Sequence, residues 1–410
     1  MNELTEQQLE ALRKYGFDLE LQKRWQRDVA DGRLCLENNA IEGDLLAPAP
    51  GSVHKLPGGN TKAHEELRRI GDEAIKRGQL GVVVLNGGMA TRFGGVVKGT
   101  VPVLGEQRTF LGLCVEDVRY HRDRTKSSIP LFCMNSFATD DATRAHFAEN
   151  ADFDLADKDI EHFTQFVACR LTKKGKLFEL EKHDDAKHSE PAASEGGSGI
   201  GGGSTDGGSN DSGLGSASPY GPGHGDFAKA FRDSGALQRF LAKGGRYLLV
   251  RNVDNLGARI DPLVLGHHIK SQCEMTVEVA PKWPDDVGGS PFHYQDRTQL
   301  IEQLRYPKDF DPNIVDVFNT NTFTFSAEAL DRDFDLGWYF VEKQVEGRDA
   351  VQIEHLIGEM TAHLSTSFLQ VRRNGRHTRF LPMKTPDDLQ SALEEIAEMY
   401  DEDDDEPLDS

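Results

Sequence analysis

The chain has 410 residues, enough for a large hydrophobic core and for two or three subdomains. Its 47 Lys and Arg against 68 Asp and Glu give a formal net charge of −21, which argues against a nucleic-acid partner or an anionic membrane surface. The 5 cysteines show no CxxC or Cys/His spacing, so they predict neither a disulfide framework nor a zinc site. No signal peptide and no apolar run of membrane-spanning length is found, so we expect a soluble cytoplasmic protein.

The first part of the chain predicts a helical extension followed by a connector. Residues 1–31 have the apolar spacing of amphipathic helices, and residues 44–60 are rich in proline and glycine. We therefore assign residues 1–60 to this extension. Alternating helices and apolar strands follow, which predicts an α/β domain with a mainly parallel sheet over residues 61–390. The first expected elements are helices at 62–78, 109–121 and 140–149 and strands at 81–85, 129–137, 163–171 and 176–181.

A low-complexity insertion, residues 183–218, interrupts the α/β pattern. Between positions 196 and 215 it is mostly Gly, Ser, Thr and Asp, with almost nothing to bury, so we expect a loop without fixed structure. The loop either hangs over the functional site or is a tolerated surface insertion with no role.

The α/β pattern resumes after the insertion. Thr385 and Asp388 predict a capping box at the start of the last helix, and residues 391–410 form the end of that helix and an acidic tail. Asn374-Gly375 is typical of a type I′ hairpin turn. The remaining expected elements are helices at 226–243, 262–271, 351–364 and 386–399, strands at 246–250, 275–282 and 315–325, and hairpins at 291–305 and at 368–373 with 376–381.

A glycine-rich segment, Asn86–Lys98, follows the buried strand Gly81–Leu85. Glycines let backbone N–H groups approach an anion, and Lys98 supplies a positive charge, so the segment is typical of phosphate binding. The spacing is neither GxxxxGK[ST] nor GxGxxG, which disfavours a P-loop enzyme and a dinucleotide-binding loop. An ordinary glycine-rich turn between strand and helix is the alternative.

Three other positions carry side chains suited to the same chemistry. Asp254 follows an apolar strand, where one carboxylate can hold Mg²⁺, and a turn or helix cap is the equal alternative. His224 lies between glycines and can bind a phosphate or a sugar hydroxyl, or can simply be exposed. Lys384 can reach a phosphate, or can be one more solvated lysine. Open α/β sheets bind ligands at the carboxyl ends of their strands, and the first two positions are expected there.

Taken together, these segments resemble the UTP–hexose-1-phosphate uridylyltransferases, above all the eukaryotic-type UDP-glucose pyrophosphorylases. The resemblance covers about 81–390 in unbroken order, and the HGD form of one loop is similar to the glucose branch of the family. The matching segments are Leu85–Gly88, Phe163–Gln165, Gly221–Asp226 (usually PPGHGD), Asn252–Ala258 (usually NIDNLGA), Glu278–Lys282, Phe318–Asn321 and Arg379–Thr385.

The resemblance implies the fold: a three-layer α/β/α nucleotidyltransferase domain of the glycosyltransferase-A-like type, with a Rossmann-like mixed sheet. It also implies a role for each matching position. Lys98, Asp254 and Lys384 are the implied catalytic residues, with Asp254 as the Mg²⁺ ligand. The implied UTP-binding residues are Leu85, Asn86, Gly87, Gly88, Lys98, Gln165 and Gly223. The implied sugar-phosphate-binding residues are His224, Asn252, Val253, Asp254, Glu278, Gly289, Asn321 and Lys384.

The sequence departs from the family at three points. Ala90 stands where the family has a glycine, and Val97-Lys98 stands where it has Pro-Lys, with a spacing one residue shorter. We also expect the C-terminal β-helix domain of the family to be absent, since few residues follow Lys384 in this sequence. We therefore expect a monomer or weak oligomer. The implied substrates are UTP and a sugar 1-phosphate, with glucose 1-phosphate favoured and Mg²⁺ as cofactor. Galactose 1-phosphate, N-acetylglucosamine 1-phosphate, and a non-catalytic nucleotide-sugar-binding protein stay open as alternatives.

Overall fold

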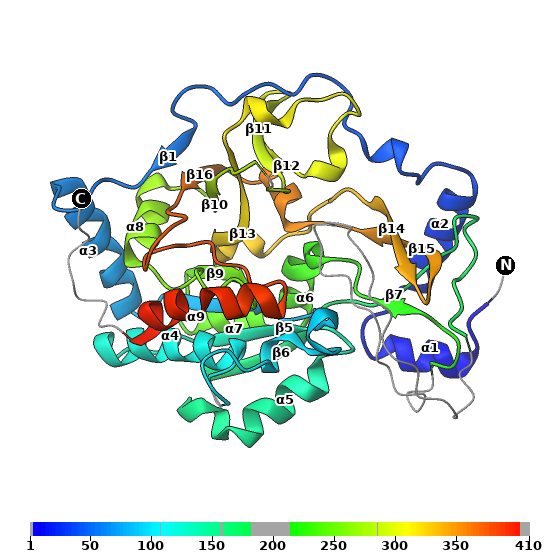
Figure 1. Ribbon diagram of the computed structural model, residues 1–410, viewed down its shortest axis with the longest axis horizontal. Coiled ribbons are helices and arrows are strands. Elements are labelled where there is room, and N and C mark those ends of the chain that lie inside the picture. Colours follow the sequence, from blue (N-terminus) through cyan, green and yellow to red (C-terminus); the bar gives the residue numbers. More distant parts are fainter. Residues whose placement is uncertain (1–2, 107, 156–158, 182–213, 285, 402–410) are drawn as a thin grey trace.

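The computed structural model describes residues 3–106, 108–155, 159–181, 214–284 and 286–401. Its centre is a mixed eight-stranded sheet in the order β1-β16-β10-β13-β9-β2-β5-β6 (Figure 1). Neighbouring strands are parallel except around β13, which is antiparallel to both β10 and β9. In that order, the strands are Val53–Lys55, Thr366–Gln370, Met275–Pro281, Val317–Ser326, Tyr247–Asn252, Leu80–Leu85, Leu131–Asn135 and Ile160–Thr164.

Alternating side chains of the central strands build one core on each face of the sheet. Val83 of β2 and Val250 of β9 pack against α6 (Phe227–Asp233) and α7 (Ala236–Ala242). Val84 and Leu249 point to the opposite face. The helices that contribute to this second core are α3 (Lys62–Lys76), α4 (Phe110–Thr125), α8 (Pro262–Ser271) and α9 (Pro386–Asp401). The predicted three-layer α/β/α arrangement is confirmed.

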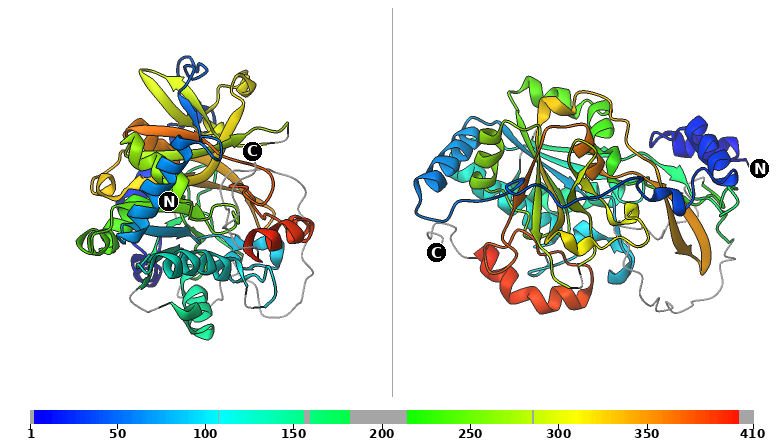
Figure 2. Two further views of the ribbon diagram at one scale, coloured as in Figure 1. Left: turned by 90° about the vertical axis from the view of Figure 1, so that its left-hand side faces the viewer. Right: turned by 90° about the horizontal axis from the view of Figure 1, so that it is seen from above.

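A smaller third core lies beyond one end of the sheet. There α1 (Glu6–Arg13) and α2 (Leu19–Ala30), the helices predicted within residues 1–31, pack on a group of short strands, and Figure 2 (right) shows the two helices in blue. The strands that contribute to this core are β7 (Ala168–Cys169), β8 (Pro219–Tyr220), β14 (Tyr339–Val345) and β15 (Arg348–Glu354).

Most predicted elements are present with small shifts at their ends. Helix α5 spans Asp140–Glu149 as predicted, and the hairpin near 291–305 consists of β11 (Ser290–Tyr294) and β12 (Arg297–Ile301). The capping box at α9 is present, since the Thr385 hydroxyl accepts from the Asp388 N–H and the Asp388 carboxylate accepts from the Thr385 N–H. Most of the predicted insertion and of the acidic tail, residues 182–213 and 402–410, lies outside the described residues.

Three predictions from local pattern are wrong. The predicted helix 351–364 begins as strand β15 and continues as a 3-10 helix over Ile357–Ala362. The predicted hairpin at Asn374-Gly375 does not form, because β16 pairs in parallel with β10 and β1 instead. The predicted helix 226–243 is interrupted at Gly235, whose φ of 76° is incompatible with a continuous helix.

Two smaller differences concern the ends of the sheet. The predicted connector, residues 44–60, contributes the edge strand β1. The predicted strand at 176–181 makes only isolated bridges, one of them between Leu171 and Leu177. Within the described residues, we find no helix with the length and apolar character needed to cross a membrane.

Candidate active site

The carboxyl ends of β2 and β9 lie side by side and open into the two predicted loops. Leu85 pairs with Asn252 in the sheet, and the Val253 N–H donates to the Leu85 carbonyl at 3.2 Å. Asn86 differs from expectation, because its fully buried side chain turns into the protein. Its Nδ2 donates to Asn135 Oδ1 at 3.0 Å and to Thr143 Oγ1 at 2.8 Å. Asn86 therefore anchors the loop and leaves the backbone of the following glycines for a ligand.

The glycine-rich segment folds back on itself and delivers Lys98 to a buried position. It forms a small hairpin of β3 (Met89–Ala90) and β4 (Val96–Val97). The Lys98 ammonium donates to the Met383 carbonyl and lies 4.0 Å from the centre of the Phe93 ring. Burial lowers the pKa of Lys98, and the charge of Asp254 opposes this shift. Lys98 therefore ties the glycine-rich segment to the residue that precedes Lys384.

Asp254 lies close enough to Lys98 and Lys384 for both charges to act on it. Burial raises the pKa of Asp254, and the two ammonium groups pull it down again. The Met383 N–H donates to the Asp254 carbonyl at 3.0 Å. This bond fixes the backbone next to Lys384, whose side chain is exposed. The three predicted catalytic residues are thus brought together, although each is far from the other two in sequence.

One carboxylate among two cations suits a magnesium ion only with help from a substrate. Mg²⁺ prefers oxygen ligands and commonly takes one or two carboxylates together with phosphate oxygens and water. Within the described residues, no set of three Asp, Glu, His or Cys side chains could hold a metal ion alone. The residues present fit a Mg²⁺ ion that arrives with a nucleoside triphosphate and binds through Asp254.

Gln165 forms one wall of the predicted nucleotide side of the site. Its backbone N–H donates to the Asn135 carbonyl at 2.8 Å, which places it at the end of the sheet. Its amide side chain is packed between two glycines: a Cβ at Gly87 would lie 3.0 Å from Gln165 Nε2, and a Cβ at Gly221 only 1.8 Å away. The glycine at 221 is therefore a steric requirement that makes room for the amide.

The Gly221–Asp226 segment is fixed by hydrogen bonds to and from His355. The His355 N–H donates to the Pro222 carbonyl at 2.9 Å, and the Gly225 N–H donates to the His355 carbonyl at 3.0 Å. Gly223 has a φ of 104°, and a Cβ there would lie 2.4 Å from the His355 carbonyl oxygen. Both the conformation and the close approach demand glycine.

His224 presents a defined hydrogen-bond donor. The Ile357 N–H donates to its Nδ1 at 3.0 Å, so the ring proton of the neutral form lies on Nε2. Burial lowers the pKa of His224 to about 4, with the nearby His355 acting in the same direction. The imidazole is therefore neutral at physiological pH and offers Nε2–H to an acceptor.

A buried polar chain lies at the predicted sugar side and includes two residues that sequence reasoning missed. Asn319 Nδ2 donates to Asn321 Oδ1 at 2.8 Å and to Glu302 Oε1 at 3.3 Å. Asn319 Oδ1 accepts from the Asn321 N–H at 2.9 Å, which supports the φ of 54° at Asn321. A Cβ at Gly289 would lie 2.7 Å from Glu302 Oε2.

Glu302 is the more informative of the two omissions. Burial raises its pKa to about 7, and the charge of Glu359 adds to this shift. A signal for it exists in the sequence, because Glu302 directly follows the apolar end of β12, just as Asp254 follows an apolar strand. The hairpin that precedes Glu302 was predicted, but a place for Glu302 in the site was not.

Glu278, in contrast, is not placed for the predicted sugar contact. Its side chain is fully buried, and its two carboxylate oxygens accept from Arg379 Nε at 2.7 Å and Nη2 at 2.6 Å. The structure favours a structural role, because the ion pair fastens the C-terminal segment to β10.

Solved structures share this fold. The chain superposes on UDP-N-acetylglucosamine pyrophosphorylase from Trypanosoma brucei with a TM-score of 0.69 and 18% identity, covering 94% of this chain and 79% of that one. UDP-glucose phosphorylase from T. brucei superposes with a TM-score of 0.67 and 23% identity, covering 94% of this chain and 77% of that one. A mutant UDP-glucose pyrophosphorylase from Leishmania major in complex with UDP-glucose superposes with a TM-score of 0.66 and 23% identity, covering 95% of this chain and 79% of that one. The architecture is therefore that of the UDP-sugar pyrophosphorylases.

The sequence narrows the class further. Residues 50–199 and 209–406 match the family described as UTP–glucose-1-phosphate uridylyltransferase, and the chain belongs to this family of nucleotidyltransferases. The enzyme of that name from Hordeum vulgare is 29% identical over 371 residues, which are 87% of this chain and 67% of the relative. The enzyme from Solanum tuberosum is 29% identical over 335 residues, 79% of this chain and 63% of the relative. The chain thus spans about two thirds of the length of these relatives.

Proposed function

We propose that this chain transfers the uridylyl group of UTP to glucose 1-phosphate in the presence of Mg²⁺, forming UDP-glucose and pyrophosphate. The observation that carries the proposal is the convergence of Lys98, Asp254 and Lys384 beside the backbone of Gly87 and Gly88. Cations, one carboxylate and free backbone N–H groups are the groups that phosphate chemistry requires, and the family membership supports this assignment.

The reaction needs no general base. A phosphate oxygen of the sugar phosphate forms a bond to the α-phosphorus of UTP, and the bond to the bridging oxygen of pyrophosphate breaks on the far side. The attacking oxygen is already anionic, so catalysis consists of positioning and charge neutralisation. Lys384 is exposed at the site and would bridge the two phosphates, whereas Lys98 would act from its buried position. The Mg²⁺ ion held by Asp254 would supply further neutralisation of phosphate charge.

Substrate recognition follows from the remaining side chains. The Gln165 amide, between Gly87 and Gly221, would read the polar edge of uracil. His224 would donate its Nε2–H to the sugar phosphate. Asn321 would donate its Nδ2–H, which has no acceptor within the described residues, since its Oδ1 is already occupied by Asn319. Glu302, below Gly289, would accept from a sugar hydroxyl.

The test is release of pyrophosphate from UTP with glucose, galactose and N-acetylglucosamine 1-phosphates, with and without Mg²⁺. We expect release with glucose 1-phosphate well above the others and its loss on chelation with EDTA. Faster release with another sugar would overturn the assigned substrate but keep the chemistry. Binding of UTP without release on any sugar would identify a non-catalytic binding protein.

A further inference from the structure

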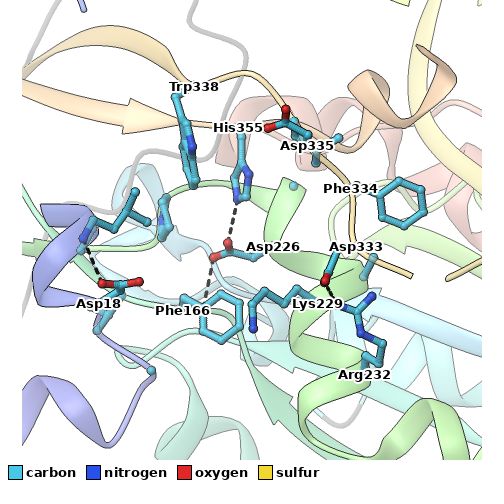
Figure 3. A pocket seen from close by; sticks show the side chains of 18 of the residues that line it. Asp18, Phe166, Asp226, Lys229, Arg232, Asp333, Phe334, Asp335, Trp338 and His355 are labelled. Carbon is cyan, nitrogen blue, oxygen red and sulfur yellow. Dashed lines mark hydrogen bonds and ion pairs between the residues drawn. The ribbon is translucent and has the colours of Figure 1, made fainter. Parts of the chain in front are cut away.

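A cavity of about 280 Å³ lies against the Gly221–Asp226 segment, and Pro222, Gly225 and Asp226 of that segment line it. Its wall is built by the α1–α2 region, the residues after β6, helix α6, the segment 332–338, His355 and Met360. None of the residues assigned above to UTP, the sugar phosphate or the metal lines it. The cavity is therefore lined by residues other than those of the proposed active site. Figure 3 shows the lining side chains.

Asp226 is a buried acceptor in this wall. Its side chain is 3% exposed, Oδ2 accepts from the Phe166 N–H at 3.1 Å, and Oδ1 contacts His355 Nε2 at 2.7 Å. Each carboxylate oxygen has a second lone pair. Within the described part of the chain, the His355 imidazole is the ion-pair partner of Asp226 and no Lys or Arg pairs with it, so the remaining lone pairs of the carboxylate can accept from a cationic donor.

The cations around the cavity are already neutralised by other acids. Arg232 pairs with Asp333, as Figure 3 shows, and Lys229 pairs with Asp233. Arg332 pairs with Glu274 at 3.0 Å.

Two further acids of the lining lack such partners. Within the described residues no Lys or Arg pairs with Asp18, which caps α2, or with Asp335. The lining holds four acids and three bases, so its formal charge is negative by one, which favours a cationic occupant over an anionic one.

Apolar and aromatic side chains form the rest of the lining. Phe166, Phe334 and Trp338, labelled in Figure 3, bring aromatic rings to the wall together with Trp25. Leu336 and Met360 add aliphatic surface. We infer that the cavity is a second ligand site for a small aromatic amine, with its ring among these side chains and its ammonium group on Asp226. The apolar wall gives affinity through burial of the ring, and the buried carboxylate selects the charge.

The test compares three small probes of similar shape: phenethylamine, 2-phenylethanol and phenylacetate. Trp25 and Trp338 line the cavity, and Trp283 is the third tryptophan of the chain, so quenching of tryptophan fluorescence in the full chain reports binding. We expect saturable quenching by phenethylamine, about tenfold weaker binding of the alcohol, and no binding of phenylacetate. The control variant Trp283→Phe should keep the quenching.

Two variants test the assignment of the groups. Asp226→Asn retains the size of the side chain and should abolish the preference for amine over alcohol. Ala228→Leu fills the cavity from α6, where Ala228 is 2% exposed, and should block all probes if circular dichroism shows a folded protein. Equal binding of amine and alcohol by the unmodified chain, tighter binding of phenylacetate, or wild-type binding by Ala228→Leu would overturn the inference, as would absence of saturable quenching.

Discussion

Lys98 and Lys384 flank Asp254, yet the two lysines are placed in opposite ways. Lys98 is 7% exposed, donates to the Met383 carbonyl and rests against Phe93, so its charge is fixed before any substrate arrives. The Lys384 side chain is exposed and no ion pair holds it within the described residues, so it is free to follow a phosphate. A preorganised charge costs little reorganisation during the reaction, whereas a mobile one can accommodate substrate entry.

Substitution of Lys384 tests the second of these roles. We expect Lys384→Ala to raise the barrier by about 3 kcal/mol, roughly a hundredfold in rate, because it removes one charge from the transition state. The measurement is pyrophosphate release under saturating substrates. Lys243→Ala, at an exposed lysine after α7, is the matched control and should keep the rate. An unchanged rate in Lys384→Ala would rule out its catalytic role.

At the scale of elements, two loops depend on a partner that is distant in sequence. The Gly221–Asp226 segment is held by His355 on the residues after β15, and the C-terminal segment is held by Glu278 on β10. The position of Lys384 therefore rests on contacts made by neighbouring residues, and that of His224 on such contacts together with its own hydrogen bond from the Ile357 N–H.

Gly223→Ala should damage the first of these loops. Its φ of 104° is unfavourable for alanine, and the added Cβ would lie 2.4 Å from the His355 carbonyl oxygen. Gly244→Ala is a matched control, since Gly244 has a φ of 91° but a Cβ added there would have nothing within 4 Å. We expect the first variant to lose more thermal stability and more pyrophosphate release than the second. Equal effects would show that the approach to His355 is unimportant.

Glu278→Ala tests the second loop and the corrected role of Glu278. Removal of one partner leaves Arg379 buried without its carboxylate, which typically costs about 3–5 kcal/mol of unfolding free energy. The same guanidinium donates to the Arg259 carbonyl at 2.6 Å, so the surrounding segment should loosen as well. Chemical denaturation measures the loss. Full stability combined with a raised KM for the sugar phosphate would restore the sugar contact predicted from the sequence.

At the scale of the whole molecule, buried histidines make stability dependent on pH. Burial lowers the pKa of His224, His162 and His267 to about 4 and that of His268 to about 3, from an ordinary value of 6.5. The unfolded chain therefore binds protons at a higher pH than the folded chain does. The contribution of these histidines is complete above pH 6.5 and is lost as the pH drops toward 4, whereas Glu302, whose pKa burial raises to about 7, contributes in the opposite direction.

We expect the thermal midpoint to decrease between about pH 7 and pH 5, before most carboxylates titrate. His268→Gln should flatten this dependence, since His268 is buried between α8 and the sheet, where it contacts Thr276 at 2.9 Å and Ser326 at 3.1 Å. The exposed histidine His363 provides the control variant His363→Gln, which should keep the wild-type slope. A midpoint independent of pH over this range would contradict the prediction.

Local patterns determined much of this architecture. The run Gly81–Leu85, the glycine-rich segment after it and the position of Asp254 after another apolar strand follow from residue type and spacing, and they predict which loops meet at the end of a parallel sheet. The capping box at Thr385 is equally local, since its two hydrogen bonds join residues three apart. Such features depend on neighbours in the chain, so a sequence alone can specify them.

The tertiary structure decided what depends on distant partners. Residues 351–354 became a strand because they pair with β14, and their burial on every side hides the period of two that marks a strand. Asn86 turned inward because Thr143 and Asn135 receive its amide. Glu278 accepts hydrogen bonds from Arg379, and Glu302 accepts one from Asn319. A buried polar group needs a hydrogen-bond partner, and that partner can come from any part of the chain that the fold brings close. The spacing of residues along the sequence does not specify which part this is.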